Sequence, residues 1–520
     1  MFGAIGHTLR LARAGFVLAR EGVFAKVDPF AVPSAARAPL ALARLLARRD
    51  AEQGALATAV ARLGPSYVKL GQFLATRADI IGPAAVRDLE RLQDRMASFP
   101  RAAAIATVEA ALGRPIGEVF TEFGEPVAAA SIAQVHRARV RDAEGERDVA
   151  VKVLRPGIER RFRRDLADMM FAARFGERHF AEARRLKMIE VVETLARTVR
   201  MEMDFRLEAA AASEFGENVT DDSDFRVPTV DWDRTSKEVL TLEWIDGTPL
   251  SNLAALRGAG FDLPQLGRTM FQSFLRHALR DGFFHADMHQ GNLFVDREGR
   301  LAAVDFGIMG RLGPKEKRFL AEAVHGFIIG DYVRVAEVHF EAGYVPKFHK
   351  VADFAQSIRA IGEPIRARTA EQISMAKLLT LLFENTALFD MRTRPELVLL
   401  QKTMVVVEGV ARTLDPKLDM WSTAAPVVKS WVEDNLGPLG KLQDAGRTMG
   451  VLGRAAAGLP ELLTRAESIA ARLAEMSDRD AEWPGGSSRP SGGGEACQFC
   501  RAPLALWLIA ALMALALVLR

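Results

Sequence analysis

Hydrophobic and polar residues follow different periods along the chain, and these periods divide it into zones. Residues 35–115 repeat Ala, Leu and Arg at helical spacing, which predicts helices. Residues 116–250 contain short strand-like runs, DVAVKVL (148–154) and EVLTLEWI (238–245), and a helical block around 160–218 interrupts them. The pattern therefore predicts a mixed α+β unit that follows an N-terminal helical segment.

The second half of the chain, residues 251–480, is predominantly helical and is punctuated by Pro and Gly. Within it, the hydrophobic runs LFV (293–295) and LAAV (301–304) flank DREG (296–299), which predicts a β-hairpin. A small mixed lobe followed by a larger helical lobe is typical of a two-lobed, protein-kinase-like fold.

The C-terminal end has a different pattern. Residues 481–496, AEWPGGSSRPSGGGEA, are rich in Gly, Ser and Pro, cannot form a core and are expected to be a flexible linker. Residues 502–519 are 18 residues without a charge. As a helix they would reach about 27 Å, just enough for a bilayer core of roughly 30 Å. We expect a single transmembrane helix rather than a buried core helix, because a long polar linker precedes it.

The N-terminal end is basic and amphipathic. Residues 1–50 hold eight Lys and Arg against three acidic residues, a net charge of +5. Apolar and basic residues alternate at helical spacing, as in a helix that lies on an anionic membrane. A helix packed on the main domain fits the pattern equally well. A mitochondrial transit peptide is the third alternative, because such peptides are also rich in Arg and poor in acids.

Composition limits the remaining classes. The chain has 520 residues, 49% hydrophobic and 26% charged, so it can form two or three packed units. The net charge of +3 gives no reason to expect nucleic acid as a partner. The only cysteines are Cys497 and Cys500, in CQFC, with no second pair and no nearby His. We interpret them as incidental thiols, and the absence of other Cys fits a reducing compartment.

The strand VAVKVL carries a lysine in its middle. An ammonium group buried in an apolar strand costs several kcal/mol unless an anion pairs with it. Lys152 therefore needs a partner, and a phosphate of ATP is a natural one, as in kinases, where this Lys holds the α- and β-phosphates. Taken alone the motif is weak, because an edge strand can carry a Lys whose charge reaches solvent.

The stretch HADMHQGN supplies a second motif. Asp287 and Asn292 have the Asp-to-Asn offset of the kinase catalytic loop, and Asp305 of DFG follows the predicted hairpin. Carboxylate and amide oxygens suit Mg²⁺. His285 stands where the kinase His does, but Ala286 replaces the kinase Arg. Such residues can also cap turns, yet strand Lys, D-x4-N, hairpin and DFG in this order predict a nucleotide–Mg²⁺ site.

With these motifs in place, the sequence resembles the UbiB family of atypical, kinase-like proteins linked to ubiquinone biosynthesis. The resemblance runs from about residue 20 to 430. It rests on HADMHQGN and DFG and on four further motifs: YVKLGQ (67–72), AAASIAQVHRA (128–138), EMDFRLEA (202–209) and VVEGVARTLDP (406–416). These look like the family's K-x-G-Q motif, its Ala-rich loop, its E-x-D motif and its C-terminal extension.

The resemblance assigns roles to individual residues. It implies that Lys152 and Glu208 orient ATP, that Asn292 and Asp305 hold Mg²⁺ and also contact the nucleotide, and that Asp287 is the catalytic-loop acid. The other nucleotide-binding residues that it implies are Ala129, Ala130, Ser131, Ala133, Glu243 and Ile245. It also implies a gate, in which Lys69 and Gln72 of the K-x-G-Q helix meet Glu202 and Asp204 and cover the site where a protein kinase takes its peptide.

The function implied by the resemblance is that of a membrane-anchored ATPase with ATP and Mg²⁺ as cofactors. Phosphorylation of other proteins is disfavoured, because GIMGRLGPKEKRFLAEAVHGF follows Val304-Asp305-Phe306 without an A-P-E motif. The expected partners are membrane lipids or quinone precursors and ubiquinone-biosynthesis enzymes. The alternatives are a catalytically weak nucleotide-binding scaffold and a true protein or small-molecule kinase. Hydroxylase chemistry is not supported, because there is no flavin fingerprint and no His/carboxylate iron constellation.

The expected location is the bacterial inner membrane, with the kinase-like part in the cytoplasm and one C-terminal span, whereas many bacterial relatives end in two. The expected organisation is a basic amphipathic helical region (1–60), a K-x-G-Q extension (61–115), an N-lobe with inserted helices (116–250), a C-lobe with the catalytic loop and DFG (251–345), a helical C-terminal extension (346–480), the linker (481–496) and the transmembrane helix (502–519).

Overall fold

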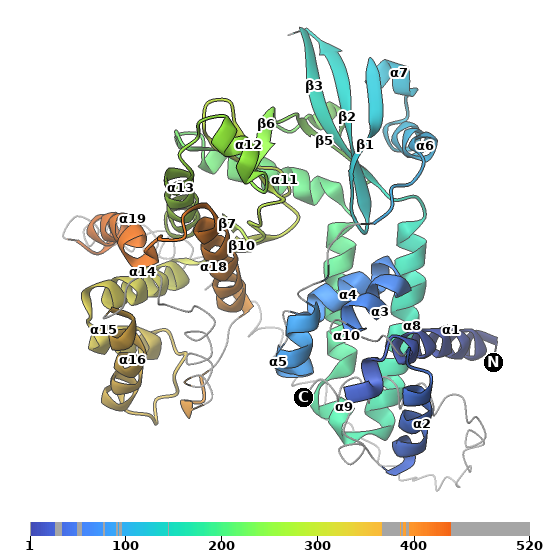
Figure 1. Ribbon diagram of the computed structural model, residues 1–520, viewed down its shortest axis with the longest axis horizontal. Coiled ribbons are helices and arrows are strands. Elements are labelled where there is room, and N and C mark those ends of the chain that lie inside the picture. The colour runs from blue at the N-terminus through green and yellow to red at the C-terminus, as the bar shows by residue number, and fades with distance from the viewer. Residues whose placement is uncertain are drawn as a thin grey trace, which may run out of the picture.

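The computed structural model describes most of the chain up to residue 437 (Figure 1). The described residues are 2–26, 34–48, 55–75, 78–89, 92, 96–143, 145–366, 385, 388–391 and 395–437. The expected linker 481–496, the expected transmembrane helix 502–519 and both cysteines lie outside them. Among the residues that are described, no helix combines the length and the apolar character needed to span a bilayer.

One antiparallel sheet forms the centre of the smaller lobe. Its strands, in the order β1-β2-β3-β5, are Glu122–Ala129, Ala133–Asp142, Gly145–Leu154 and Val239–Glu243. The predicted strand 148–154 lies within β3, where Val149, Val151 and Val153 are fully buried on one face. Helix α6 (Arg101–Leu112) covers this face with Ala104 and Val108, and α7 (Ile116–Val119) follows it. Lys152 therefore projects from the opposite face of the sheet.

The predicted helical block around 160–218 consists of four helices. These are α8 (Ile158–His179), α9 (Ala181–Arg185), α10 (Met188–Glu202) and α11 (Phe205–Asn218). Helices α8 and α10 lie side by side as a long pair that runs away from the sheet, and α11 returns to it (Figure 1). Asp204 begins α11 by accepting a hydrogen bond from the backbone N–H of Arg206, as a helix N-cap does.

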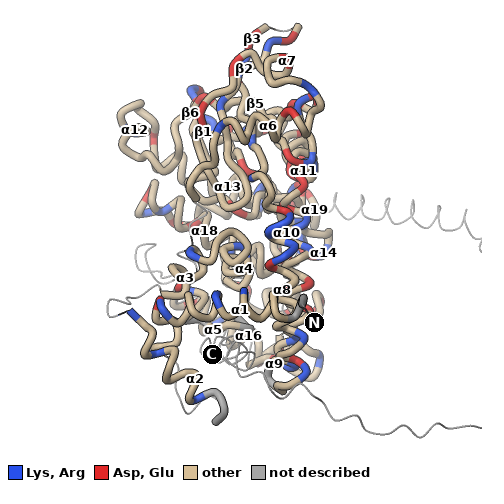
Figure 2. Tube along the Cα trace, turned by 90° about the vertical axis from the view of Figure 1, so that its right-hand side faces the viewer, with Lys and Arg blue, Asp and Glu red and all other residues tan. Residues whose placement is uncertain are grey.

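The N-terminal helices pack against the α8–α10 pair, on the side away from the sheet (Figures 1 and 2). They are α1 (Phe2–Arg20), η1 (Val23–Lys26), α2 (Ser34–Leu45), α3 (Ala55–Leu63), α4 (Pro65–Ala75) and α5 (Ala78–Leu89). The predicted boundary at residue 60 therefore falls inside α3.

A buried carboxylate fastens α1 to α8. Asp168 of α8 is 2% exposed, and its two oxygens lie 2.6 Å from Nε and from one terminal nitrogen of Arg10. His7 contacts the same carboxylate at 2.5 Å. The face of α1 that carries His7 and Arg10 thus packs on the main domain, which was one of the alternatives for the basic N-terminal segment. Leu9 and Phe16 of α1 remain exposed.

The larger lobe contains a second sheet in the order β4-β9-β8-β6: Phe225–Arg226, Leu301–Ala303, Leu293–Asp296 and Gly247–Pro249. Strands β8 and β9 form the predicted hairpin, and Gly299 in its turn has φ +84°, which favours glycine. Strands β7 (Phe283–His285) and β10 (Met309–Arg311) pair beside it. Strands β4 and β6 precede residue 250, but they pair with β9 and β8, which follow it. The predicted boundary at residue 250 therefore divides this sheet.

Helices form the rest of this lobe. They are α12 (Leu253–Gly258), α13 (Leu263–Arg276), the π-helical turn η3 (His277–Asp281), α14 (Pro314–Ile329), α15 (Tyr332–Glu341), α16 (Val351–Arg366), α18 (Pro395–Leu414) and α19 (Met420–Leu436). Helix α13 is central, and both α18 and α19 pack on it. The core here joins Phe271 and Phe274 of α13 to Val407 of α18 and Val428 of α19.

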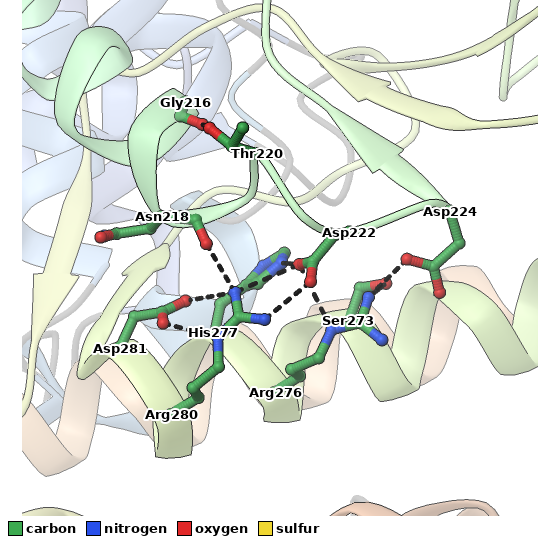
Figure 3. A network of polar contacts seen from close by, with 10 residues as sticks. All are labelled: Gly216, Asn218, Thr220, Asp222, Asp224, Ser273, Arg276, His277, Arg280 and Asp281. Carbon is green, nitrogen blue, oxygen red and sulfur yellow. Dashed lines mark hydrogen bonds and ion pairs between the residues drawn. The ribbon is translucent and has the colours of Figure 1, made fainter.

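A polar network connects the end of α11 to α13 and η3 (Figure 3). Asp222, 5% exposed, accepts hydrogen bonds from Nε2 of His277 at 3.1 Å and from Arg280 at 2.7 Å. Nε of Arg276 lies 3.3 Å from the same carboxylate. Burial would raise the pKa of Asp222, but the bonds from His277 and Arg280 hold it below its usual range. The network fixes the far end of the helix that carries Glu208.

Candidate nucleotide-binding site

Lys152 forms an ion pair with Glu208 of α11. Its side chain is 17% exposed, and Nζ lies 2.7 Å from Oε1 and 2.9 Å from Oε2 of Glu208. The ring of Phe205 lies under the ammonium, 5.4 Å from Nζ to the ring centre. The buried strand lysine thus has the anionic partner that its position requires, and α11 supplies it.

Asp305 brings the DFG segment to the same ammonium group. Its Oδ2 lies 3.4 Å from Nζ of Lys152, and its Oδ1 accepts a hydrogen bond from the backbone N–H of Gly307 at 3.1 Å. Its side chain is 44% exposed, whereas that of Glu208 is 8% exposed. The sheet of the smaller lobe, the inserted helix α11 and the hairpin of the larger lobe therefore meet at one point.

The three charges shift one another's pKa values. Burial alone would lower the pKa of Lys152, but the carboxylates of Asp305 and Glu208 outweigh it and raise the pKa above its usual range. Burial raises the pKa of Glu208 to about 7 although Lys152 opposes the shift. Desolvation also acts to raise the pKa of Asp305, but Lys152 lowers it well below its usual range. Asp305 is therefore the carboxylate that stays ionised at neutral pH.

The catalytic-loop residues lie next to this group. The amide nitrogen of Asn292 donates to the carbonyl oxygen of Asp287 at 3.1 Å and lies 3.5 Å from its Oδ2. The carbonyl of Asn292 accepts from the backbone N–H of Val304, which precedes Asp305. The spacing of the motif thus reflects a closed turn from Asp287 to Asn292 that is hydrogen-bonded to the strand leading into DFG.

The buried side chain of His285 is hydrogen-bonded to the start of this turn. It is 1% exposed, and its Nδ1 accepts a hydrogen bond from the backbone N–H of Asp287 at 3.1 Å. Burial lowers the pKa of His285, so its ring is neutral at pH 7, as an accepting nitrogen requires. The Asp287 side chain is 43% exposed and lies 3.7 Å from Nε2 of His289.

The Ala-rich loop connects β1 to β2 as a tight turn. The backbone N–H of Ala130 donates to the carbonyl of Ala133 at 2.8 Å, and Arg155 donates to the carbonyl of Ala130 at 3.1 Å. The side chains of Ser131 and Ala133 are buried, at 0% and 1% exposure, whereas Ala129 and Ala130 are partly exposed. Of the four predicted loop residues, Ala129 and Ala130 are therefore the ones accessible to a ligand.

Glu243 and Ile245 lie at and just after the end of β5. The carboxylate of Glu243 is paired with Arg226 at 2.5 Å, and its backbone N–H donates to Thr229 at 2.8 Å. Ile245 is 8% exposed. The side chain of Glu243 is thus engaged with Arg226 of β4.

Two of the four residues expected to form a gate, Lys69 and Glu202, form an ion pair. Nζ of Lys69 on α4 lies 2.8 Å from Oε2 of Glu202 at the end of α10, with the two side chains 13% and 14% exposed. Gln72 is half-buried, three residues further along α4 and so on the same face as Lys69. Asp204, expected to join this pair, caps α11 and pairs with Arg206 at 2.7 Å.

Two features that the sequence analysis did not identify hold α4 in place. Ser66 donates to Asp165 of α8 at 2.8 Å, and Gly71 packs so closely that an added Cβ would lie 2.6 Å from Leu92 Cδ1. The sequence carried one signal. Asp165 and Asp168 are three apart on a helical face whose other residues, such as Phe162 and Met169, are apolar and buried. Acidic residues in such positions need partners from elsewhere in the chain.

The donor set fits a magnesium ion that is bound together with a nucleotide. Asp305 offers a partly exposed carboxylate, and Asn292, whose backbone carbonyl is bonded to the neighbouring Val304, offers an amide oxygen. Among the described residues, no group of three or more His, Cys, Asp or Glu side chains could hold a metal ion alone. Mg²⁺ typically uses one or two protein ligands, waters and substrate phosphates, so this arrangement suits it.

Comparison with known proteins identifies the family of the chain. Residues 91–339 match the ABC1 atypical kinase-like domain, and residues 358–419 match the UbiB helical domain. A protein of Marinobacter nauticus named "Probable protein kinase UbiB" is 41% identical over 393 residues, which cover 75% of this chain and 71% of that protein. A solved complex of Rv3197 with erythromycin from Mycobacterium tuberculosis is 24% identical and has a TM-score of 0.47, over 74% of this chain and 95% of that one. The chain therefore belongs to the UbiB family of atypical kinase-like proteins.

Proposed function

We propose that the protein is a membrane-anchored ATPase that binds Mg-ATP and supports ubiquinone biosynthesis by acting on or near polyprenylphenol lipids. The observation that carries the proposal is the position of Lys152, which shares its ammonium group between Glu208 and Asp305. A strand lysine, a helix glutamate and a DFG aspartate in this relation are the parts with which kinases orient a nucleotide.

Each residue has a distinct role in the proposal. Lys152 pairs with the phosphates, and Glu208 holds Lys152 in place. Asp305 and Asn292 hold Mg²⁺, which neutralises charge on the phosphates. Asp287, partly exposed and hydrogen-bonded to Asn292, receives a proton from the attacking water. Lys152 keeps the pKa of Asp305 below its usual range, so the carboxylate is ionised at neutral pH, as a metal ligand must be.

Hydrolysis rather than transfer to another protein is favoured by helix α4. The Lys69–Glu202 ion pair fixes α4 next to the site, and the positive charge of Lys69 is close enough to lower the pKa of Asp305. No A-P-E motif follows DFG to form a peptide-docking platform. A small phenolic head group needs less access than a folded protein, so lipid-like quinone precursors are the proposed partners.

Nucleotide titration of the full chain in detergent micelles tests the ATP site. Glu208→Gln and Asp305→Asn should each weaken Mg-ATP binding about 100-fold, because the first removes the nearer carboxylate that holds Lys152 and the second removes a proposed ligand of Mg²⁺. Glu214→Gln is the matched control, since Glu214 lies on the same helix but pairs with Arg311 at the surface. Wild-type affinity in Asp305→Asn would remove Asp305 from the site and overturn the proposal.

Phosphate release separates an enzyme from a scaffold. Asp287→Asn should keep nucleotide affinity but lower turnover about 100-fold, in the range expected for loss of a general base. A phenol that mimics the quinone head group should raise the turnover of the wild-type protein. Nucleotide binding without any turnover in detergent, with or without the phenol, would favour the scaffold alternative.

Cell experiments test the role and the location. Ubiquinone should fall in a strain that lacks the protein, return with the wild-type chain and stay low with Asp305→Asn. We propose that residues 502–519 anchor the protein in the bacterial inner membrane, with the nucleotide site in the cytoplasm. A chain that ends at residue 496 should leave the membrane fraction after an alkaline wash, whereas the full chain should remain. Equal retention of both would disprove this anchor.

A further inference from the structure

Helix α18, from the helical extension, donates a hydrogen bond to the catalytic loop. Thr403 is fully buried, and its hydroxyl oxygen lies 3.1 Å from the carbonyl oxygen of Ala286 and 2.8 Å from that of Leu399. The bond to Leu399 is the ordinary one within a helix, so a Thr on any helix could make it. Because the hydroxyl has a single proton, the carbonyls of Leu399 and Ala286 share it in a three-centre hydrogen bond, and the arm to Ala286 reaches the residue directly before Asp287.

Ala286 is held from its other side as well. Its backbone N–H donates to the carbonyl of Ile308, just after DFG, at 3.0 Å. The residue is 7% exposed, so an unpaired carbonyl here would be shielded from water. Both polar groups of Ala286 are thus paired, one with the DFG segment and the other with α18.

Helix α19 makes a second contact of the same kind. Nε1 of Trp431 donates to the carbonyl of Leu279 at 2.9 Å. Leu279 is 1% exposed and lies in the π-helical turn η3, which links α13 to β7. A π-helical turn departs from the usual i−4 bonding of an α-helix, so external donors are useful there. The two helices therefore bind the backbone before and after β7.

The residue type at position 286 makes these contacts informative. Ala286 stands where a protein kinase has the Arg of its H-R-D motif, and arginines can order kinase loops by pairing with a phosphorylated residue. Alanine has no charge with which to do so. The donors found here are neutral: the hydroxyl of Thr403 is buried, and the indole of Trp431 is partly buried.

We propose that α18 and α19 position the catalytic loop permanently, with Thr403 and Trp431 as positioning residues for Asp287. The loop is then ordered without phosphorylation, and the helical extension is part of the catalytic machinery. The effect on turnover rests on the proposed ATPase function, but the effect on loop order does not.

Paired substitutions test the proposal on the full chain in detergent. Thr403→Val keeps the shape and removes the hydroxyl, and Thr413→Val is its control, because Thr413 of α18 is exposed and bonds only its own helix at Gly409. Trp431→Phe removes the indole N–H. Its control is Trp421→Phe, since Nε1 of Trp421 has no hydrogen-bond partner among the residues described. Thr403→Ser keeps the hydroxyl and should restore wild-type behaviour.

Hydrogen exchange measures loop order directly. Backbone amides of residues 283–292 should exchange about tenfold faster in Thr403→Val and Trp431→Phe, as loss of one buried hydrogen bond predicts. Those of β3 should not change. In phosphate release, kcat should fall about fivefold or more while KM for Mg-ATP stays within about twofold, because the ligands of the nucleotide are untouched.

The results distinguish the two proposals. Exchange in Thr403→Val equal to that in Thr413→Val, or faster exchange in Thr403→Ser equal to that in Thr403→Val, would overturn the positioning role. An equal rise in exchange across β3 would show a general loss of stability and would also overturn it. If the wild-type protein neither binds nor hydrolyses Mg-ATP, the proposed function fails, and the exchange data still decide the role of the helices.

Discussion

The ammonium group of Lys69 on α4 lies 2.8 Å from the carboxylate of Glu202 at the end of α10. Both side chains are largely buried, so the pair is shielded from solvent and salt more than a surface ion pair is. It joins an N-terminal helix to the helices inserted between β3 and α11. Helix α4 is therefore fixed to the same insertion that delivers Glu208.

A double-mutant cycle tests whether this ion pair limits nucleotide exchange. Lys69→Met and Glu202→Gln should each speed the release of a fluorescent ATP analogue about fivefold, since either change frees α4, and the double variant should be no faster. Stopped-flow fluorescence measures the rate. Lys187→Met and Glu190→Gln form the control, because that pair is 72% and 64% exposed and lies on the insertion away from α4. Strict additivity of the two effects would separate Lys69 from Glu202.

The Asp222 network predicts unequal effects of two neighbouring aspartates on stability. Asp222→Asn should lower the free energy of unfolding by about 3 kcal/mol, because three cationic or potentially cationic side chains lose a buried acceptor. Asp224→Asn should lower it by less than about 1 kcal/mol, since the side chain of Asp224 is 35% exposed and pairs with Arg276. Urea unfolding measures both, and equal effects would contradict the proposed hierarchy.

His339 predicts a loss of stability in acid. Burial lowers the pKa of His339 to about 4, so the folded protein binds fewer protons than the unfolded chain between pH 6.5 and 4. Its contribution is present above pH 6.5 and is lost as the pH falls towards 4, by about 3 kcal/mol. His339→Phe should flatten the stability profile in this window, whereas His179→Phe, at an exposed position, should not. Parallel profiles for wild type and His339→Phe would refute the prediction.

Gly71 predicts a steric limit in the K-x-G-Q helix. Alanine usually stabilises a helix interior by about 1 kcal/mol relative to glycine. At position 71, however, the added Cβ would lie 2.6 Å from Leu92 and 3.1 Å from Val60, so Gly71→Ala should destabilise the protein by about 1–3 kcal/mol. Gly409→Ala on α18, where nothing lies within 4 Å, should be neutral or stabilising. Thermal unfolding compares the two, and stabilisation by both would show that α4 and α5 can separate freely.

Much of the local structure could be predicted from sequence. Strand β3 and the β8–β9 hairpin have alternating or uninterrupted apolar runs next to turn residues, and these patterns depend only on neighbours in the chain. The offset from Asp287 to Asn292 could likewise be assigned, because one turn accounts for it. The resemblance to the UbiB family is confirmed by the comparisons, which also cover the helical extension.

Contacts between distant segments could not be derived in this way. Neither the helical period of α1 nor that of α8 indicates that His7 and Arg10 meet Asp168, because the period gives a face and not its partner. Asp204 differs from these cases, because its bond as the cap of α11 is local, to the backbone N–H of Arg206. The bond from Thr403 to Ala286 depends on how two helices dock, which no local pattern records.

The helices α8 and α10 run out from the sheet and back, so the chain leaves β3 and re-enters at α11 close to where it departed (Figure 1). The Lys152–Glu208 pair therefore depends on the base of this hairpin and not on its tip. Insertions or deletions around α9 can change how far helices α8 and α10 project without altering the nucleotide site. Variation in length among relatives is expected to accumulate at this tip, and a reporter tag placed there should leave nucleotide binding intact.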